Sequence, residues 1–346
     1  MGKNQKKAAS RGKEALEKVR KIIKKEGAEG WNLVKETLLN QKTRSPQLKE
    51  AINYALLKPD YFRPAIISLC SKAVGGSSEV TITYGASLVM LAKAIGIHDD
   101  IIDKLEKRGK HFTLFGKFGK EIALIISDIL LFKGFTLILK DHETGTPLKK
   151  NGRIFDTIEK FWFEQSESEI QELRSQRQMN ITPQECLAKI EMRASELEAT
   201  TRIGGILGDG STMEVEALGR YGRFLGIASI LRDELIDMLE QNMLKHRIRN
   251  ESLPLPLIYA MQKPKLRYQI TSRISRKSLT NKDLLTISKV CDEAGGMIRV
   301  AENIAASVQK ACSYIGLIKN ENKELELLAT SLLMHPIEWK ATLQSM

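Results

Sequence analysis

The helical spacing of its apolar residues is the feature that most constrains how this chain folds. Apolar residues recur every three or four positions over long stretches, and the alternating runs typical of strands are scarce. The longest stretches cover residues 79–104, 119–140 and 213–243. The chain has 346 residues, of which 42% are hydrophobic and 28% charged, so it has enough apolar material for a sizeable core. We therefore predict an all-α fold with ten or more helices in a single bundle.

Turn-forming residues divide this pattern into shorter units. The segment 182–185 (Thr-Pro-Gln-Glu) predicts a helix start, because Thr182 can cap the helix and Glu185 can complete a capping box. We expect one helix from there to about Leu207. Within residues 28–57 we expect two short helices, broken near residues 43–46.

The excess of basic residues concerns partners more than fold. The net charge is +12, and ten of the basic residues lie before residue 28. We interpret residues 1–27 as a basic N-terminal extension that can touch a membrane surface peripherally, and residues 28–346 as the helical domain. No nucleic-acid recognition motif accompanies the charge, so we expect no nucleic-acid partner.

The chain lacks sequence features of export or membrane insertion. Its four cysteines, Cys70, Cys186, Cys291 and Cys312, show no CxxC spacing, which argues against a zinc site and favours buried, reduced thiols. No signal peptide is recognisable, and no uninterrupted apolar run reaches the ~20 residues needed to span a bilayer. We expect a cytoplasmic protein.

Two acidic clusters close long apolar stretches. Their members are Asp99, Asp100 and Asp103 in the first cluster, and Asp233, Glu234 and Asp237 in the second. In each cluster the first and last carboxylates are four residues apart, so on a helix they share one face and repel each other unless a cation neutralises them. One such pair is more often a solvated helix face. Two clusters on facing helices instead favour a Mg²⁺ site, because Mg²⁺ prefers carboxylate, water and phosphate oxygens.

Short motifs flank both clusters in a fixed order. The first cluster is preceded by Phe62-Arg63-Pro64-Ala65 and followed by Lys107-Arg108-Gly109 and Ser127-Asp128-Ile129-Leu130, and residues 221–226 lead into the second. Together these landmarks resemble the trans-isoprenyl (polyprenyl) diphosphate synthase family over about residues 58–262. The resemblance implies the type I isoprenoid synthase fold, a single large helical bundle around a central cavity.

The same resemblance implies an activity. Members of the family are prenyltransferases that condense an allylic diphosphate with isopentenyl diphosphate to a longer trans-polyprenyl diphosphate. About three Mg²⁺ ions, present with the bound diphosphate, assist ionisation of the allylic substrate. A homodimer, or a heterodimer with a related subunit, is also implied.

The resemblance assigns a role to ten residues. Metal binding falls to all six carboxylates of the two clusters, and catalysis to Asp99, Asp100, Asp103, Asp233 and Arg193. Lys107 and Arg193 would bind the allylic diphosphate, with Arg193 standing where the family has Lys. Arg63 and Arg108 would bind isopentenyl diphosphate.

Other positions depart from the family pattern. Asp60 stands where the family has Lys, Ala92 where it has His, and Ala194 where it has Thr. The first two affect the isopentenyl half of the site, so three interpretations remain open, in order of preference. In the first, the chain is a divergent elongating synthase in which other basic residues, such as Arg247 and Arg249, replace the lost ones. In the second, it is a terpene synthase on the same fold. In the third, it is a weakly active subunit of a hetero-oligomeric synthase.

Small residues before the first cluster carry one expectation about product length. In the family, bulky aromatic residues four or five positions before this cluster stop elongation. Here those positions are Ile95 and Ala94, with Leu91 one turn deeper. We therefore predict a cavity that is open beyond a farnesyl chain.

Overall fold

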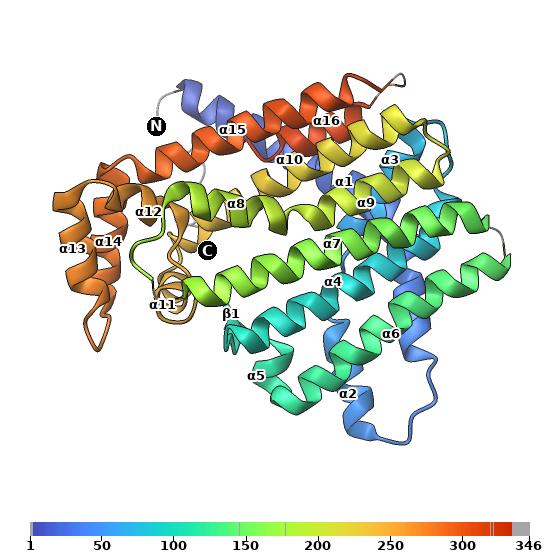
Figure 1. Cartoon of the computed structure of the whole chain (residues 1–346), viewed down its shortest axis with the longest axis horizontal. Helices are drawn as coiled ribbons and strands as arrows, with labels where there is room; N and C mark the ends of the chain where they lie inside the picture. Colours follow the sequence, from blue (N-terminus) through green and yellow to red (C-terminus); the bar gives the residue numbers. More distant parts are fainter. Residues whose placement is uncertain (1–2, 145, 177, 319, 321, 334–346) are drawn as a thin grey trace.

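The computed structural model describes residues 3–144, 146–176, 178–318, 320 and 322–333. The described residues form a helical bundle with one short hairpin (Figure 1). The first half of the chain contains α1 (Lys3–Leu39), α2 (Pro46–Ala55), α3 (Phe62–Ala73), the 3-10 turn η1 (Glu79–Thr81), α4 (Ile82–Ile102), β1 (Lys107–Arg108), β2 (His111–Phe112), α5 (Leu114–Phe118) and α6 (Lys120–Thr144). The second half contains α7 (Leu148–Ser175), α8 (Pro183–Arg193), α9 (Ser195–Leu207), α10 (Thr212–Asp237), α11 (Gln241–Asn250), α12 (Leu255–Met261), α13 (Pro264–Ile274), α14 (Asn281–Glu293), α15 (Gly296–Ile315) and α16 (Lys323–Thr330).

Long helices form the body of the bundle, which confirms the predicted all-α class. In Figure 1, α9 lies against α7 and α10, α4 packs on α6, and α15 covers α10. The helices α4 and α10 bury residues on several faces, as expected of helices with an apolar surface all round. Their last turns point towards the end of the molecule that carries β1 and α11 (Figure 1).

Local capping explains where several helices begin. At the start of α8, the Thr182 hydroxyl accepts a hydrogen bond from the Glu185 amide at 3.2 Å, and the Glu185 carboxylate accepts one from the Thr182 amide at 2.7 Å. The predicted capping box is therefore confirmed. Ser211 and Glu214 form a second one at the start of α10.

The prediction of one helix from residue 182 to 207 is wrong. The chain turns at Ala194, with φ −73° and ψ −4°, between the end of α8 and the start of α9. Helix α10 approaches closely here, since a Cβ atom on Gly226 would lie 2.9 Å from the Ala194 side chain. The turn leaves Arg193 at the C-terminal end of α8. The expected helix 213–243 is likewise divided, because α10 ends at Asp237 and α11 begins at Gln241.

The N-terminal region is one long helix where shorter ones were expected. The predicted break before α2 is confirmed, but α1 continues through residue 27 without interruption. Val19 is buried in the core, and Glu26 pairs with Lys72 and accepts a hydrogen bond from Ser68. No structural boundary therefore marks residue 27, and the division into an extension and a domain remains a prediction. Residues 1–2 of the expected extension and residues 334–346 of the expected domain lie outside the described residues.

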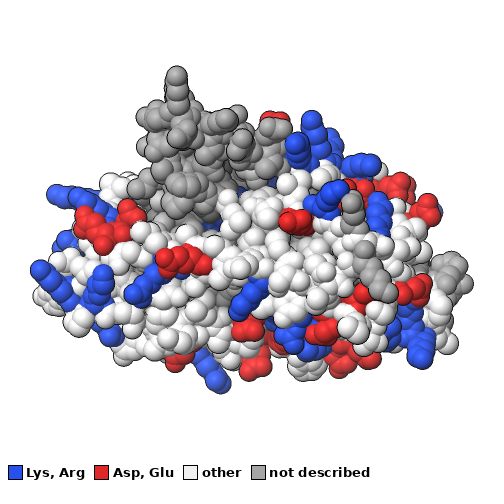
Figure 2. Space-filling view, turned by 90° about the horizontal axis from the view of Figure 1, so that it is seen from above, with Lys and Arg blue, Asp and Glu red and all other residues white. Residues whose placement is uncertain are grey.

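Charged side chains are mixed by sign on the molecular face drawn in Figure 2. Lysine and arginine side chains there stand beside aspartate and glutamate, separated by uncharged areas. The positive net charge is therefore not gathered into one continuous basic patch on this face.

Among the residues that the structure describes, two helices are long and apolar enough to cross a membrane by length and composition alone. They cover residues 79–102 and 120–140. The most apolar window of the first helix is 61% buried inside the protein, and that of the second is 33% buried. The first is mostly buried in the core of the bundle, and a buried core helix can pass this test without crossing a membrane. The second exposes Ile125, Phe132 and Leu139 along one side of α6.

Candidate metal and diphosphate site

The two acidic clusters meet in one pocket of about 430 Å³ where α4, α7, α8, α10 and α11 come together. Both clusters lie in the last turns of their helices, α4 and α10. Nine carboxylate residues line the pocket, namely Asp99, Asp103, Glu169, Glu172, Asp233, Glu234, Asp237, Glu240 and Glu251. Of the described residues, three cationic ones line it with them: Arg108, Arg193 and Arg247. This excess of negative charge is relieved either by bound cations or by protonation of some of the carboxylates.

The first cluster divides between two sides of α4. Asp99 and Asp103 line the acidic pocket, whereas Asp100 is buried towards another pocket and accepts hydrogen bonds from Arg108 at 2.9 and 3.2 Å. Asp103 caps the end of α4, and its Oδ1 atom is buried without a hydrogen-bond partner. A buried carboxylate oxygen without a partner is costly, so a cation at this point would stabilise the site.

Burial and mutual repulsion perturb the carboxylates that line the pocket. Burial, followed by the charges of Glu251 and Glu169, raises the pKa of Asp103 to about 8. Burial and the charge of Asp99 raise the pKa of Glu169 to about 7. Burial and the neighbouring Asp237 raise the pKa of Asp233 to about 6. A bound cation would reverse these shifts by favouring the charged form of each group.

Two glutamates of α7 belong to this site and were not predicted. Glu169 stands beside Asp99, and Glu172 pairs with Lys189 at 2.8 Å and accepts a hydrogen bond from the Ser252 amide at 2.7 Å. Burial opposes ionisation of Glu172, but Lys189 outweighs it and lowers the pKa to about 2. Several glutamates occur along α7 without a distinguishing spacing, so the sequence held no signal for these two.

The second cluster is held by an arginine from α11. The Arg247 guanidinium lies 2.7 Å from Glu234, 2.8 Å from Asp237 and 2.7 Å from Glu251. Glu234 also accepts a hydrogen bond from the Leu255 amide at 2.7 Å. Asp233 lines the same pocket as Glu234 and Asp237 but makes no ion pair with Arg247.

Arg193 reaches the pocket as predicted. It is half-buried at the end of α8, and within the described part of the chain its guanidinium has no hydrogen bond or ion pair. Burial opposes its charge, but the nearby Asp99 raises its pKa above the ordinary value. A guanidinium that is not engaged by other described residues is well suited to bind a diphosphate.

The donor set fits Mg²⁺ only in part. Over the described ranges, no three acidic, histidine or cysteine side chains come close enough to hold an ion by themselves. Mg²⁺ does not require this, because it usually takes one or two carboxylates and completes its shell with water and phosphate oxygens. Asp99, Asp103 and Asp233 meet that requirement, whereas Glu234 and Asp237 are engaged by Arg247. The metal assignments of all six carboxylates remain predictions.

Two residues expected to bind substrate lie outside the acidic pocket. Arg63 pairs with both Asp60 and Glu196, so two carboxylates already neutralise it. Lys107 lies on the exposed strand β1, with its Nζ atom 4.3 Å from the centre of the Phe112 ring. Among the further candidates, Arg249 of α11 donates to backbone carbonyls of Ile274 and Arg276.

A second pocket, of about 580 Å³, lies on the other side of Asp100. Four basic residues line it: Lys58, Lys93, Arg108 and His111. The Lys93 ammonium donates to the carbonyls of Ala55 at 3.2 Å and Lys58 at 3.1 Å. Sequence reasoning missed Lys58 and Lys93; Lys93 directly follows Ala92, the position that had lost its histidine.

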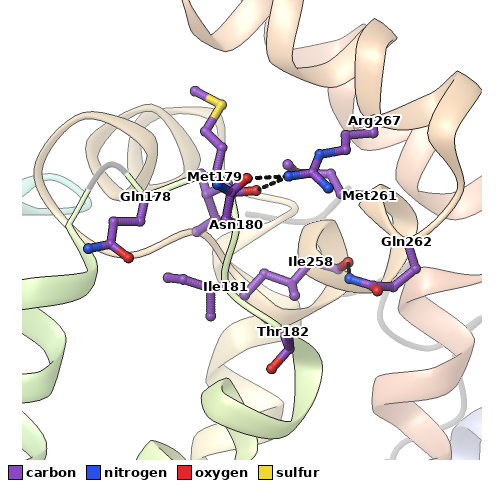
Figure 3. A pocket seen from close by; sticks show the side chains of 10 residues that line it. Gln178, Met179, Asn180, Ile181, Thr182, Ile258, Met261, Gln262 and Arg267 are labelled. Atoms are coloured by element: carbon purple, nitrogen blue, oxygen red, sulfur yellow. Dashed lines mark hydrogen bonds between the residues drawn. The ribbon is translucent and has the colours of Figure 1, made fainter.

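A third pocket has a different character. It has a volume of only about 100 Å³ and lies between the segment after α7 and the helices α12 and α13 (Figure 3). Arg267 closes it by donating to the Met179 carbonyl and the Asn180 side chain. No carboxylate lines it, so it offers no metal ligands of the kind found in the acidic pocket.

Comparison with known proteins agrees with this geometry. A family model described as polyprenyl synthetase matches residues 45–290, more than half of the chain. The short chain isoprenyl diphosphate synthase of Methanothermobacter thermautotrophicus is 24% identical over 273 residues, which cover 78% of this chain and 80% of the relative. The octaprenyl diphosphate synthase of Escherichia coli is 26% identical over 254 residues, 71% of this chain and 75% of the relative.

Solved structures share the fold. The geranylgeranyl pyrophosphate synthetase of Pyrococcus horikoshii superimposes with a TM-score of 0.83 at 20% identity, covering 92% of this chain and 99% of its own. A polyprenyl synthase of Caulobacter crescentus, in complex with calcium and isoprenyl diphosphate, gives a TM-score of 0.78 at 18% identity, covering 91% and 98%. These likenesses confirm the type I isoprenoid synthase fold. From the extent of the family match, the chain belongs to the polyprenyl synthetase family of prenyl-transferring enzymes.

Proposed function

We propose that this protein condenses an allylic diphosphate with isopentenyl diphosphate to a longer trans-polyprenyl diphosphate, with Mg²⁺ as cofactor. The proposal rests on the acidic pocket, which lies in a chain that belongs to the polyprenyl synthetase family. Asp99, Asp103 and Asp233 converge there from two helices, beside the unengaged guanidinium of Arg193.

The residues of the acidic pocket support ionisation of the allylic substrate. Mg²⁺ bound there would act as a Lewis acid that neutralises the departing diphosphate. Asp99, Asp103 and Asp233 would hold the cofactor, and Arg193 would donate to diphosphate oxygens as negative charge develops on them. One turn before Asp99, Ile95 packs against the same buried apolar cluster as Phe135 and Trp162, and this apolar region would exclude water from the allylic cation.

The basic pocket beyond Asp100 supports binding of the second substrate. Lys58, Lys93, Arg108 and His111 surround a volume large enough for a five-carbon diphosphate. Arg108 lines this pocket as well as the acidic one, so it stands between the two proposed diphosphates. The alkene of isopentenyl diphosphate would form the new carbon–carbon bond to the allylic cation, and its proton would pass to the released diphosphate. We therefore propose that Lys58 and Lys93 bind isopentenyl diphosphate in place of the Lys and His that the family has at the positions of Asp60 and Ala92.

One observation favours the alternatives. Arg63, a residue expected to bind isopentenyl diphosphate, is neutralised by Asp60 and Glu196. A terpene synthase, which ionises one allylic diphosphate and takes no second substrate, would not need Arg63. A weakly active subunit of a hetero-oligomeric synthase would not need it either.

An apolar stripe on α6 supports a dimer as part of the proposal. Ile125, Phe132 and Leu139 are spaced seven residues apart and are more than half exposed. Positions seven apart lie on one face of a helix, and an exposed face of this kind is typical of an interface between subunits. We propose that a second copy of this chain, or a related subunit, covers it.

A product assay tests the proposal. The protein would be incubated with Mg²⁺, labelled isopentenyl diphosphate and geranyl, farnesyl or geranylgeranyl diphosphate, and the extract analysed with and without phosphatase. Prenyl alcohols that are longer than the substrate and seen only after phosphatase would establish elongation and its length. Hydrocarbon formed from the allylic substrate alone would instead identify a terpene synthase. Loss of all activity without a paralogous subunit, with recovery on adding it, would identify the third role.

A further inference from the structure

Lys93 lies between the basic pocket and the N-terminal helix α1. Its ammonium group donates to the carbonyls of Ala55 and Lys58, and its Nζ atom lies 5.3 Å from the centre of the Trp31 ring. Trp31 belongs to α1, is only 2% exposed and does not itself line the basic pocket. The lysine that we assign to isopentenyl diphosphate is therefore backed by an aromatic ring from a distant part of the chain.

Close packing of α1 holds this ring in place. A Cβ atom on Gly27 would collide with the Tyr61 carbonyl oxygen, and one on Gly30 would lie 2.6 Å from the Pro64 Cβ atom. Glycine at these two positions therefore lets α1 approach the start of α3 closely. Tyr61 also meets the Trp31 ring edge to face, with the ring centres 6.4 Å apart. The ring that meets the ammonium group is thus fixed by neighbours that do not line the basic pocket.

The ring stabilises a charge that burial opposes. Burial lowers the pKa of Lys93, and the positive charge of Asp60's partner Arg63 acts in the same direction, while Asp60 opposes both. An aromatic ring face attracts an ammonium group and so favours its charged form. This attraction acts on the charge as a whole and uses no ammonium hydrogen. Two hydrogens can therefore stay on the carbonyls while the third is left for a diphosphate oxygen.

We propose that Trp31 is a positioning residue of the basic pocket, which holds the Lys93 ammonium group in place to bind isopentenyl diphosphate. The family match covers residues 45–290, so it assigns no role to α1. The inference rests on the proposed function for the identity of the second substrate. It adds a residue that acts through Lys93 without touching the substrate.

A double-mutant cycle on isopentenyl diphosphate binding tests the inference. Calorimetry without an allylic substrate would give the Kd for the wild type, Trp31→Leu, Lys93→Met and the double variant, and Trp31→Phe would be measured as the substitution that keeps a ring. Leu38→Ala is the matched control. Leu38 is also 2% exposed and belongs to the same apolar cluster as Trp31, but it lies about two turns further along α1.

The expected result is specific to each variant. Trp31→Leu should weaken isopentenyl diphosphate binding about 2- to 30-fold, the range expected for loss of a cation–π contact, and leave the KM for the allylic substrate unchanged. Trp31→Phe should lose less affinity than Trp31→Leu. In the Lys93→Met background, Trp31→Leu should have little further effect on the Kd. Leu38→Ala should lower the thermal midpoint but keep the wild-type Kd.

Fluorinated tryptophan gives a second measurement that does not depend on the folding of Trp31→Leu. Incorporated at every tryptophan of the full chain, it withdraws electrons from the ring face at nearly unchanged size. The Kd should therefore rise in the otherwise wild-type protein and stay the same in Lys93→Met.

Other results would overturn the inference. One is an unchanged Kd in folded Trp31→Leu, or an equal loss of affinity in the wild-type and Lys93→Met backgrounds. Another is a Kd that fluorination leaves unchanged. These outcomes leave the proposed function standing, provided that the wild type binds isopentenyl diphosphate. A wild-type protein that does not bind it would refute both proposals.

Discussion

Replacing Lys93 by methionine removes the ammonium group from the basic pocket but keeps an unbranched side chain of similar length. Two of the three ammonium hydrogens are directed to the carbonyls of Ala55 and Lys58, so one remains for a diphosphate oxygen. A hydrogen bond to a charged group contributes about 1.5–3 kcal/mol, which corresponds to about a 10- to 150-fold loss of affinity for isopentenyl diphosphate. Stability should fall by only about 1 kcal/mol, because water can reach carbonyls at the edge of a pocket.

Two measurements check this prediction. Calorimetry would give the Kd of isopentenyl diphosphate whether or not the enzyme turns over, and the KM for the allylic substrate should stay the same, since Lys93 does not line the acidic pocket. Lys117→Met is the matched control: Lys117 lies near this region, pairs with Glu50 at 3.1 Å and contacts the Tyr54 ring, but does not line the basic pocket. Equal affinity in the folded Lys93 variant and this control would refute our assignment of the second substrate to this pocket.

Further predictions concern other parts of the molecule. Arg193→Gln should lower the rate of allylic ionisation about 100-fold in single-turnover experiments, with partial recovery in Arg193→Lys; an unchanged rate would remove Arg193 from catalysis. Mn²⁺ affinity should rise between pH 6 and 8, because Asp103 and Glu169 must lose protons to bind a cation. In the folded protein the pKa values of Asp103 and Glu169 lie above the ordinary values near 4, so the folded metal-free protein holds more protons than the unfolded chain. Its thermal midpoint should therefore fall as pH rises from about 4 to 8. An Asp103→Asn variant whose thermal midpoint depended on pH as steeply as that of the wild type would contradict this. Ile95→Phe should shorten the product analysed by chromatography, since Ile95 lies one turn before Asp99 and packs against a buried apolar cluster; unchanged length would show that the hydrocarbon runs elsewhere. Phe132→Asp should convert a dimer to monomers in sedimentation equilibrium with no loss of helix content, and an unchanged mass would place the interface away from α6.

Of the two positions before the first cluster that could limit product length, Ala94 and Ile95, only Ile95 is suited to a test by substitution. Ala94 is fully buried, and its helix face packs on α6, where Ser127 donates to the Ala94 carbonyl at 3.1 Å. Phenylalanine there would overpack the core and destabilise the protein by about 1–3 kcal/mol. Ile95 is half-buried and leaves room for a larger side chain, so the informative substitution is one residue further along.

The proposed membrane contact of the basic N-terminal region is best tested with a short deletion. Deletion of residues 1–26 would remove Val19 from the core and Glu26 from its contacts with Lys72 and Ser68. Deleting residues 1–13 removes basic charge without touching either contact. Membrane contact through the basic region predicts that this shorter deletion reduces co-sedimentation with anionic liposomes.

Features fixed by neighbours in the sequence were predictable, and features fixed by distant parts of the chain were not. The start of α8 was predicted because Thr182 and Glu185 satisfy each other's backbone groups within one turn. The break at Ala194 was missed because the close approach of Gly226 on α10 accompanies it. Cys70, Cys186 and Cys291 are buried as expected, because their apolar neighbours carried that signal, whereas Cys312 is only partly buried.

In the candidate site, too, contacts between distant parts of the chain could not be predicted from the sequence. The convergence of Asp99 and Asp233 in one pocket agrees with the family resemblance. The engagement of Glu234 by Arg247 depends on α11 turning back towards α10, which no local pattern encodes. The meeting of Lys58 with Lys93 joins positions 35 residues apart and likewise required the folded chain.

The placement of both acidic clusters at the C-terminal ends of α4 and α10 has a consequence for the sequence of events in a reaction cycle. The carboxyl end of a helix carries a partial negative charge of about −0.5, so two helix ends add to the charge of the carboxylates. A bare diphosphate approaching this end of the bundle would be repelled, whereas a diphosphate that arrives with its cations would be attracted. Cation and diphosphate should therefore enter together, and the departure of the cation should in turn expel the diphosphate left after bond formation. The direction of two helices thereby imposes an order on binding and release.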